Sequence, residues 1–258
     1  MGGDAVIHIE HLSKSYESEK GAKTYVLDNV SLDIPRGEFH VFRGWSGCGK
    51  STLLNVIAGF VPKSGGRVTV NGRDIEGPGR ERGVVFQNAD AAIFPWNTVW
   101  KNVEYGLRIK GTPKAERDAI VRRCIKIVGL ETHENKYPDE LSGGMKQRVQ
   151  IARSIANDSE ILIMDEPFGA LDAQTRRLMQ KEVVGIWKET GKTILFVTHD
   201  IQEAVSLGQK VSIMSRSPNA TIIETIEIGV PYPRKINNAQ VADFIQRIQG
   251  FFDVEYEI

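Results

Sequence analysis

The chain has 258 residues, enough for one large domain or two modest ones with a full hydrophobic core. Apolar residues make up 41% and charged residues 26%, which is ordinary for a soluble globular protein. Lysine plus arginine equals aspartate plus glutamate, at 33 each, so the overall charge does not favour binding to nucleic acid or to anionic lipid.

Strands are predicted near the start of the chain, at 5–12 and 30–34, and the polar stretch 17–23 between them is expected to be an exposed loop. Downstream, the segment 65–75 places Val68 and Val70 on one side of a strand. It then reverses at Asn71-Gly72, a pair typical of a hairpin turn. These elements predict an antiparallel β subdomain in the N-terminal part of the chain.

The most informative stretch lies between a predicted strand at 38–42 and a predicted helix. It fits the pattern G-x-x-x-x-G-K-[ST], whose glycines let backbone N–H groups turn inward around an anion. Lys50 is expected to reach the β and γ phosphates of a nucleotide, and the Ser51 hydroxyl to bind Mg²⁺. The helix that follows adds its positive end to the same site. The candidate nucleotide-binding residues of this loop are Gly44, Trp45, Ser46, Gly47, Cys48, Gly49, Lys50, Ser51 and Thr52.

Apolar strands alternate with helical patterns along the rest of the chain, which indicates a parallel sheet covered on both faces. A predominantly helical stretch is predicted from about 98 to 157, inserted into this core. The predicted core strands lie at 83–87, 160–165, 193–198 and 211–215. Near the end, a short helix is expected to place Phe244, Ile248 and Phe251 on one side and to pack against the core.

Two carboxylates follow the buried strand at 160–165, at the edge where ligands gather in open parallel sheets. Asp165 is expected to hold Mg²⁺, directly or through water, as the corresponding aspartate does in P-loop NTPases. Glu166 is placed to polarise an attacking water. This pair favours hydrolysis over transfer of a phosphoryl group to another substrate.

A second site for an anion is predicted at 141–149, where Ser142 is a good helix N-cap and Gly143 and Gly144 expose the first N–H groups of the helix. One nucleotide in one compact core does not need two such sites. We therefore infer that this segment faces a nucleotide bound to a partner subunit.

The order and spacing of the phosphate loop, "LSGGMKQRV", "ILIMDEP", "GALD" and "THD" resemble those of the ATP-binding-cassette ATPases over nearly the whole chain. The resemblance implies an α/β fold: a P-loop NTPase (RecA-like) parallel sheet core with an N-terminal antiparallel β subdomain and a helical insert subdomain. It implies a single domain over 1–258, with the helical subdomain at about 90–158 and a C-terminal extension at about 231–258.

The resemblance also implies roles for single residues. Tyr16 is similar to the aromatic residue that stacks on adenine, although Tyr25 is a competitor for this role. Gln87 is similar to the glutamine that senses Mg²⁺ and the γ phosphate, and His199 to the switch histidine. The residues expected to contact the partner's ATP are Ser142, Gly143, Gly144 and Asp172, the expected ligands of Mg²⁺ are Ser51, Gln87 and Asp165, and the catalytic pair is Glu166 and His199.

Two positions depart from the family pattern. Trp45 stands where proline is common, so we expect the contacts of the loop, or its affinity for nucleotide, to differ. Gln209 stands where an aspartate is usual, at a place expected to lie far from the γ phosphate.

The family contains transporter motors and soluble ATPases that act on nucleic acid or ribosomes. This chain has one cassette, without the long coiled-coil insertion or second cassette of the soluble members, which favours a transporter. An apolar group after Gln87 is expected to receive a membrane subunit, the alternative being that it forms the core of the insert. Its members are Ile93, Phe94, Trp96, Val99 and Trp100. The segments around this group and at 214–234 look most like the ATPases of nitrate, sulfonate and taurine importers.

The resemblance implies a homodimer that binds two ATP molecules, joined to transmembrane permease subunits and served by an extracytoplasmic solute-binding protein, with no nucleic acid involved. No apolar run approaches the roughly 18 to 20 residues that span a bilayer, so any role at a membrane is expected to be peripheral. The start of the chain lacks the pattern of a secretory signal, and two cysteines, Cys48 and Cys124, make a disulfide framework improbable. The expected location is the cytoplasmic face of the inner membrane.

Overall fold

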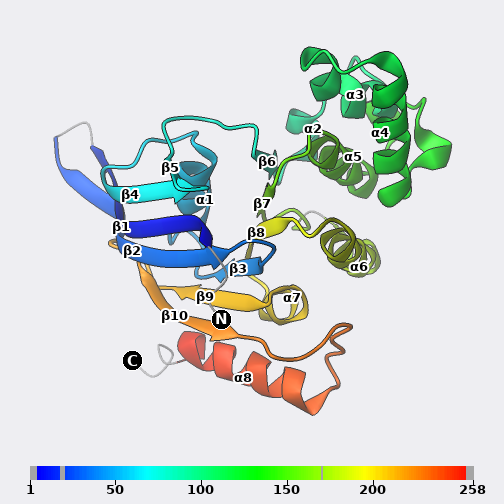
Figure 1. Cartoon of the computed structure of the whole chain (residues 1–258). Coiled ribbons are helices and arrows are strands. Elements are labelled where there is room, and N and C mark those ends of the chain that lie inside the picture. The colour runs from blue at the N-terminus through cyan, green and yellow to red at the C-terminus, as the bar shows by residue number, and fades with distance from the viewer. Residues whose placement is uncertain (1–4, 18–20, 170, 254–258) are drawn as a thin grey trace. The chain divides into compact units, whose positions relative to one another are not determined.

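The computed structural model describes residues 5–17, 21–169 and 171–253. They form two compact units, one with the described residues up to Gly79 together with those from Thr193 onward, and the other with Arg80–Lys192. Both units combine strands with helices (Figure 1). The parallel core strands, the N-terminal antiparallel sheet and the helical region confirm the predicted fold class.

The first unit contains an antiparallel sheet with the strand order β2-β1-β4-β5. Its strands are β1 (Ala5–Glu17), β2 (Lys23–Pro35), β4 (Gly65–Val70) and β5 (Arg73–Asp74). Asn71 and Gly72 join β4 to β5 with φ values of 51° and 72°, as the hairpin prediction requires. The first two strands are longer than predicted, because irregularities in their register let the pairing continue to Glu17 and Lys23. Residues 18–20 of the predicted loop lie outside the described residues.

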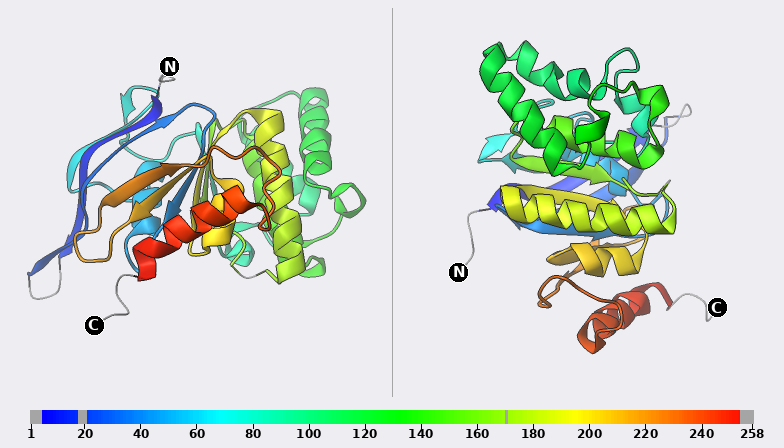
Figure 2. Two further views of the ribbon diagram at one scale, coloured as in Figure 1. Left: turned by 90° about the horizontal axis from the view of Figure 1, so that it is seen from below. Right: turned by 90° about the vertical axis from the view of Figure 1, so that its right-hand side faces the viewer.

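The first unit also holds the strand that precedes the phosphate loop. Strand β3 pairs in parallel with β8 on one side and β9 on the other, and β10 adds to β9 in the antiparallel direction. These strands are β3 (Phe39–Arg43), β8 (Thr193–Thr198), β9 (Lys210–Met214) and β10 (Ile222–Glu227), and the accompanying helices are α1 (Lys50–Ala58), α7 (Ile201–Leu207) and α8 (Ala239–Asp253). Helix α8 lies against α7 (Figure 2).

The second unit pairs β6 with β7 in parallel and contains the predicted helical region. Helices α3, α4 and α5 contact one another, and α2 and α6 both contact α5. The elements of this unit are β6 (Arg82–Val85), α2 (Ala89–Ala92), α3 (Val99–Ile109), α4 (Lys114–Ile127), α5 (Gly143–Ala156), β7 (Ile161–Asp165) and α6 (Ala173–Thr190), with 3-10 turns at Glu131–His133 and Pro138–Glu140.

The C-terminal helix corrects one prediction. Helix α8 has 15 residues, and it buries Val241, Ile248 and Phe252, whereas Phe251 is only half-buried. The buried residues are spaced by seven and four, which keeps them on one side of a helix with 3.6 residues per turn. Of the three residues predicted to pack, Ile248 is buried, whereas Phe244 and Phe251 are half-buried. Residues 254–258 of the predicted extension lie outside the described residues.

A chain of buried polar groups crosses β3, β9 and β10. The ring of His40, which is fully buried, bonds Glu38 Oε1 at 2.7 Å through Nδ1 and Ser212 Oγ at 2.8 Å through Nε2. Ser212 continues the chain to Thr225, and Lys210 Nζ lies 2.9 Å from Glu38 Oε2. Burial alone would raise the pKa of Glu38, but the hydrogen bonds and charges of His40 and Lys210 lower it below its ordinary value of 4.5.

Glu38→Gln tests this ion pair through the pH dependence of stability. Because the folded-state pKa of Glu38 is lowered, its contribution is complete above pH 4.5 and is lost as the pH falls further. We expect the variant to lose about 2 kcal/mol of unfolding free energy at pH 7 and the difference from wild type to shrink below pH 4.5. Urea unfolding at pH 3 to 7 measures this, with the exposed Glu227→Gln as control. A difference that stays constant with pH would contradict it.

Candidate functional site

The phosphate loop begins where β3 ends, and it enters α1 through a glycine that no other residue can replace. Gly49 caps α1 with φ +99°, a left-handed conformation that L side chains rarely adopt. A Cβ at Gly49 would also lie 2.9 Å from both Val26 Cγ1 and Leu27 Cδ2. No described side chain caps the first turn of α1. Its N–H groups therefore remain available to bind an anion.

Lys50 is held inside this loop. The residue is 5% exposed, and Nζ donates to the carbonyl oxygens of Gly44 at 3.0 Å and Trp45 at 2.7 Å. Ser46 and Ser51 are exposed beside it, whereas Cys48 is buried. Burial raises the pKa of the Cys48 thiol. The loop thus presents a cation, hydroxyls and free N–H groups, a set that binds phosphate.

Cys124 is buried as well, and burial raises its pKa to about 11. Both cysteines are free thiols in the structure.

Tyr16 and Tyr25 occupy different surroundings near this loop. Tyr16 is 46% exposed and pairs with Thr24, while Tyr25 is half-buried and pairs with Ser15. Neighbouring residues of a strand point to opposite faces, so the two rings lie on opposite faces of the β1–β2 ribbon. Val26, which contacts the loop, lies two residues after Thr24, or about 7 Å along the strand. Tyr25 is nearer to Val26 along the chain, but Tyr16 is the more exposed of the two rings, which favours Tyr16 for stacking on a base.

His199 lies directly after the buried strand β8 and is exposed. The next residue, Asp200, fixes the chain on both sides of it. Its N–H donates to Thr198 Oγ1 at 3.0 Å, and its carboxylate accepts from the N–H of Glu203 at 3.1 Å as the N-cap of α7. The turn that carries His199 is therefore held by the hydrogen bonds of Asp200.

In the second unit, the two predicted carboxylates lie at the C-terminal end of β7. Asp165 ends the strand and is half-buried, and Glu166 comes next with φ +43°. A positive φ is uncommon for a residue with a side chain, and such strained positions are typical of functional sites. The backbone thus turns sharply at the residue predicted to polarise water.

Gln87 follows β6 and is exposed. Two residues that were not predicted, Gln147 and Gln150 of α5, hold the segment before it. Both are buried and donate to the carbonyl of Phe86 at 3.2 Å, and Gln150 Oε1 accepts from the Phe86 N–H at 3.0 Å. Two glutamines at positions i and i+3, on the same face of the predicted helix, were the available signal for this role.

The predicted second anion site forms the start of α5. Ser142 is the N-cap, with Oγ accepting from the N–H of Met145 at 3.4 Å, and Gly143 is exposed in the first turn. Gly144 is buried, and a Cβ there would lie 2.8 Å from Thr175 Cγ2 of α6. The two glycines thus serve different purposes, one leaving N–H groups open and the other allowing close helix packing.

Asp172 uses its carboxylate to cap α6. Oδ1 accepts from the N–H groups of Gln174 at 3.0 Å and Thr175 at 2.9 Å, and Oδ2 accepts from the Thr175 hydroxyl at 2.7 Å. These bonds, led by the N–H of Thr175, lower the pKa of Asp172. Thr175 therefore bonds Asp172 and packs against Gly144. It thus links two residues that are predicted to contact the partner's ATP.

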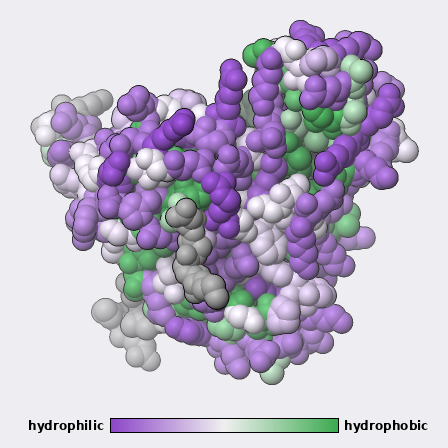
Figure 3. Space-filling model, viewed as in Figure 1, coloured by the Kyte–Doolittle hydropathy of each residue, from purple (hydrophilic) through white to green (hydrophobic). Residues whose placement is uncertain are grey.

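The apolar group after Gln87 divides into core and surface. Ile93 and Val99 are buried, so the alternative that they belong to the core of the helical region holds for them. Phe94 is half-buried, with its ring 4.5 Å from that of Tyr105, and Trp100 is half-buried as well. Trp96 is 70% exposed. Figure 3 shows hydrophobic residues grouped over the helices of this unit.

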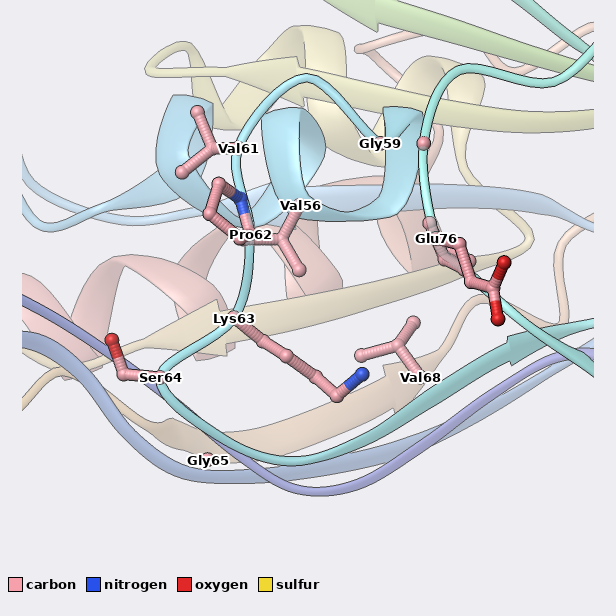
Figure 4. Close-up of a pocket in the computed structure, with 11 residues that line it drawn as sticks. Val56, Gly59, Val61, Pro62, Lys63, Ser64, Gly65, Val68 and Glu76 are labelled. Carbon is pink, nitrogen blue, oxygen red and sulfur yellow. The ribbon is translucent and has the colours of Figure 1, made fainter.

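A pocket of about 560 Å³ opens at the C-terminal end of α1, the end away from the phosphate loop (Figure 4). Lys63 and Glu76 are its charged residues, and Val56, Val61 and Val68 contribute apolar walls. It contains none of the predicted site residues.

Each unit therefore gathers its own part of the predicted site. The first unit holds Tyr16, the loop residues 44–52 and His199. The second holds Gln87, Ser142, Gly143, Gly144, Asp165, Glu166 and Asp172. In the part of the chain that the structure describes, no helix is long and apolar enough to cross a membrane.

Comparisons with known proteins match these features. The sequence model of the ABC transporter family matches residues 27–169. An uncharacterized ABC transporter ATP-binding protein of Methanocaldococcus jannaschii is 46% identical over 94% of this chain and 89% of its own. The taurine import ATP-binding protein TauB of Rhizobium johnstonii is 48% identical over 84% of this chain and 82% of its own.

Among solved structures, the dimeric structure of MJ0796, a bacterial ABC transporter cassette, is similar with a TM-score of 0.75 and 32% identity. The match covers 87% of this chain and all of that one. The family match and these relatives show that the chain belongs to the ATP-binding proteins of ABC transporters, which are ATPases coupled to transport.

Proposed function

We propose that the chain powers an importer of taurine or of a similar small solute, such as another sulfonate or nitrate. The phosphate loop, with its buried Lys50 and its uncapped helix, carries the nucleotide chemistry. The similarity to taurine import ATP-binding proteins supports the solute class. These relatives favour transport over the alternative of a soluble ATPase acting on nucleic acid or ribosomes.

In this proposal ATP binds the phosphate loop of the first unit. The N–H groups of the loop and α1, together with Lys50, bind the β and γ phosphates, and Tyr16 stacks on adenine. Ser51, Gln87 and Asp165 are the proposed ligands of Mg²⁺. All three offer hard oxygen atoms, which suit this ion. No cluster of three or more His, Cys, Asp or Glu side chains occurs among the described residues.

Hydrolysis requires a water molecule and a group that polarises it. We assign this role to Glu166, because it is a carboxylate directly after β7 and its positive φ is a strained backbone conformation of the kind found at functional sites. Bound Mg²⁺ would neutralise phosphate charge. His199 is assigned to the γ phosphate, since the capped turn that carries it limits its movement.

The segment at Ser142, Gly143 and Gly144 is proposed to bind ATP held by a second copy of the chain. The dimeric structure of a related cassette supports a homodimer. Asp172 would face the same interface while it caps α6. ATP then favours the closed dimer only to the extent that it binds this state more tightly than the open one, and hydrolysis removes that preference.

The closed dimer would act on transmembrane permease subunits at the cytoplasmic face of the inner membrane, in a system that also contains an extracytoplasmic solute-binding protein. Trp96 is the proposed contact with the permease, because a tryptophan that is 70% exposed is typical of a partner surface. The ring of Phe94 packs beside that of Trp96, with 5.7 Å between the two ring centroids.

Glu166→Gln tests the catalytic assignment. The amide keeps the size of the side chain but cannot accept a proton, so we expect turnover to fall at least about 100-fold while ATP binding persists. The variant should accumulate as a dimer with ATP, which size-exclusion chromatography detects. The control is Glu160→Gln, an exposed glutamate that precedes the other end of β7. Normal turnover by Glu166→Gln would assign the water to another group.

The transport role is tested by isolating the tagged protein from detergent-solubilised membranes of its native host and identifying its partners by mass spectrometry. We expect a multi-span permease to co-purify with wild type and to be lost with Trp96→Ala, while basal ATPase activity is unchanged. Ile109→Ala, at another exposed apolar residue of the same unit, should retain the permease. Recovery only with ribosomes or nucleic acid would refute the transport role.

A further inference from the structure

The ring of Phe252, near the end of α8, contacts Arg43 at the end of β3 and Trp45 in the phosphate loop. Its centroid is 4.5 Å from that of Trp45, with an angle of 56° between the rings, and 3.9 Å from the guanidinium carbon of Arg43. Arg216 lies over the Trp45 ring at 4.8 Å. Phe252 is buried. The two aromatic rings thus contact each other and lie between two guanidinium groups, an arrangement in which each neighbouring pair attracts.

The same cluster leads directly to Lys50. Arg43 Nη1 donates to the carbonyl oxygen of Gly44 at 2.8 Å, and Lys50 Nζ donates to this oxygen and to that of Trp45. Both carbonyl groups that accept from the ammonium therefore belong to residues that this cluster contacts. The Gly44 carbonyl accepts from the Arg43 guanidinium, which lies over the Phe252 ring. The Trp45 carbonyl belongs to the residue whose indole contacts the Phe252 ring.

Helix α8 is well anchored apart from this contact. Arg234, in the segment that leads to it, donates to the carbonyl oxygens of Val205 at 2.8 Å and Gly208 at 2.5 Å, at the end of α7, and to that of Ile228 at 2.9 Å. Arg247 on α8 pairs with Glu224 of β10. Phe252 is thus presented to the loop by a helix that other contacts hold in place.

We propose that Phe252 is a positioning residue for ATP binding, which it promotes by holding the carbonyls of Gly44 and Trp45, and through them the Lys50 ammonium, in the geometry that receives phosphate. The proposal rests on the proposed ATP site and extends it to a helix that contains none of the predicted site residues. A preorganised loop loses less conformational freedom when the nucleotide binds.

The test compares Phe252→Leu, which keeps an apolar side chain but removes the ring, with Phe252→Tyr, which keeps the ring. We expect the leucine variant to bind a fluorescent ATP analogue about fivefold or more weakly and to show a similar rise in KM, from the loss of the aromatic and cation–π contacts. Its kcat should change less than about twofold, because no catalytic group is touched. The tyrosine variant should restore affinity.

Phe251→Leu is the matched control, since it makes the same change at the next, half-buried residue of α8. Melting temperatures exclude a general loss of folding. In a Trp45→Ala background the effect of Phe252→Leu should be clearly smaller, because part of the path to Lys50 is already lost. Wild-type affinity of Phe252→Leu, or an effect that is undiminished in the Trp45→Ala background, would overturn the proposal.

Lys50→Ala in the same assay separates this proposal from the ATP site itself. Loss of binding by Lys50→Ala together with normal binding by Phe252→Leu leaves the site intact and removes only the role of α8. Normal binding by Lys50→Ala would instead refute the assigned site.

Discussion

The nucleotide site depends on a close contact between the start of α1 and the antiparallel sheet. Gly49 adopts a left-handed conformation against Val26 and Leu27, with no room for a side chain. This conformation turns the chain abruptly from the loop into the helix, so the first N–H groups of α1 face the loop. The antiparallel sheet therefore does more than flank the core, because its strand β2 forms the wall against which the loop folds.

In the second unit, helix α5 has the corresponding organising role. Gln147 and Gln150 hold the backbone of Phe86, next to Gln87, while Gly144 at the start of the same helix packs on Thr175. A shift of the segment before Gln87 must therefore strain bonds to the helix that carries the proposed contact with a partner's ATP. The hydrogen bonds connect, within one unit, a residue assigned to sensing nucleotide and a residue assigned to binding it in the partner.

Sequence patterns predicted the parts of the site that depend on local geometry. The phosphate loop, the turn at Asn71-Gly72 and the cap at Ser142 each need particular residues at neighbouring positions, and the structure contains all three. The edge strand β10 and the buried role of Phe252 were missed, because both depend on contacts with distant residues. Burial of Ile93 and Val99 within the aromatic group is likewise set by the packing of the helical region.

Both helix α8 and the segment that leads to it contact α7. Arg234 binds carbonyl groups at the end of α7, whose other end follows His199, and α8 packs against the same helix before it reaches Trp45. Through the contacts of Phe252, the proposed positioning of Lys50, the cation of the loop, involves residues far later in the chain. The hydrogen-bond acceptors of Lys50 are backbone carbonyls. Their positions depend on the packing around the loop as well as on the residues of the sequence motif. Cassettes with the same phosphate-loop motif can therefore differ in affinity for nucleotide when their C-terminal helices differ.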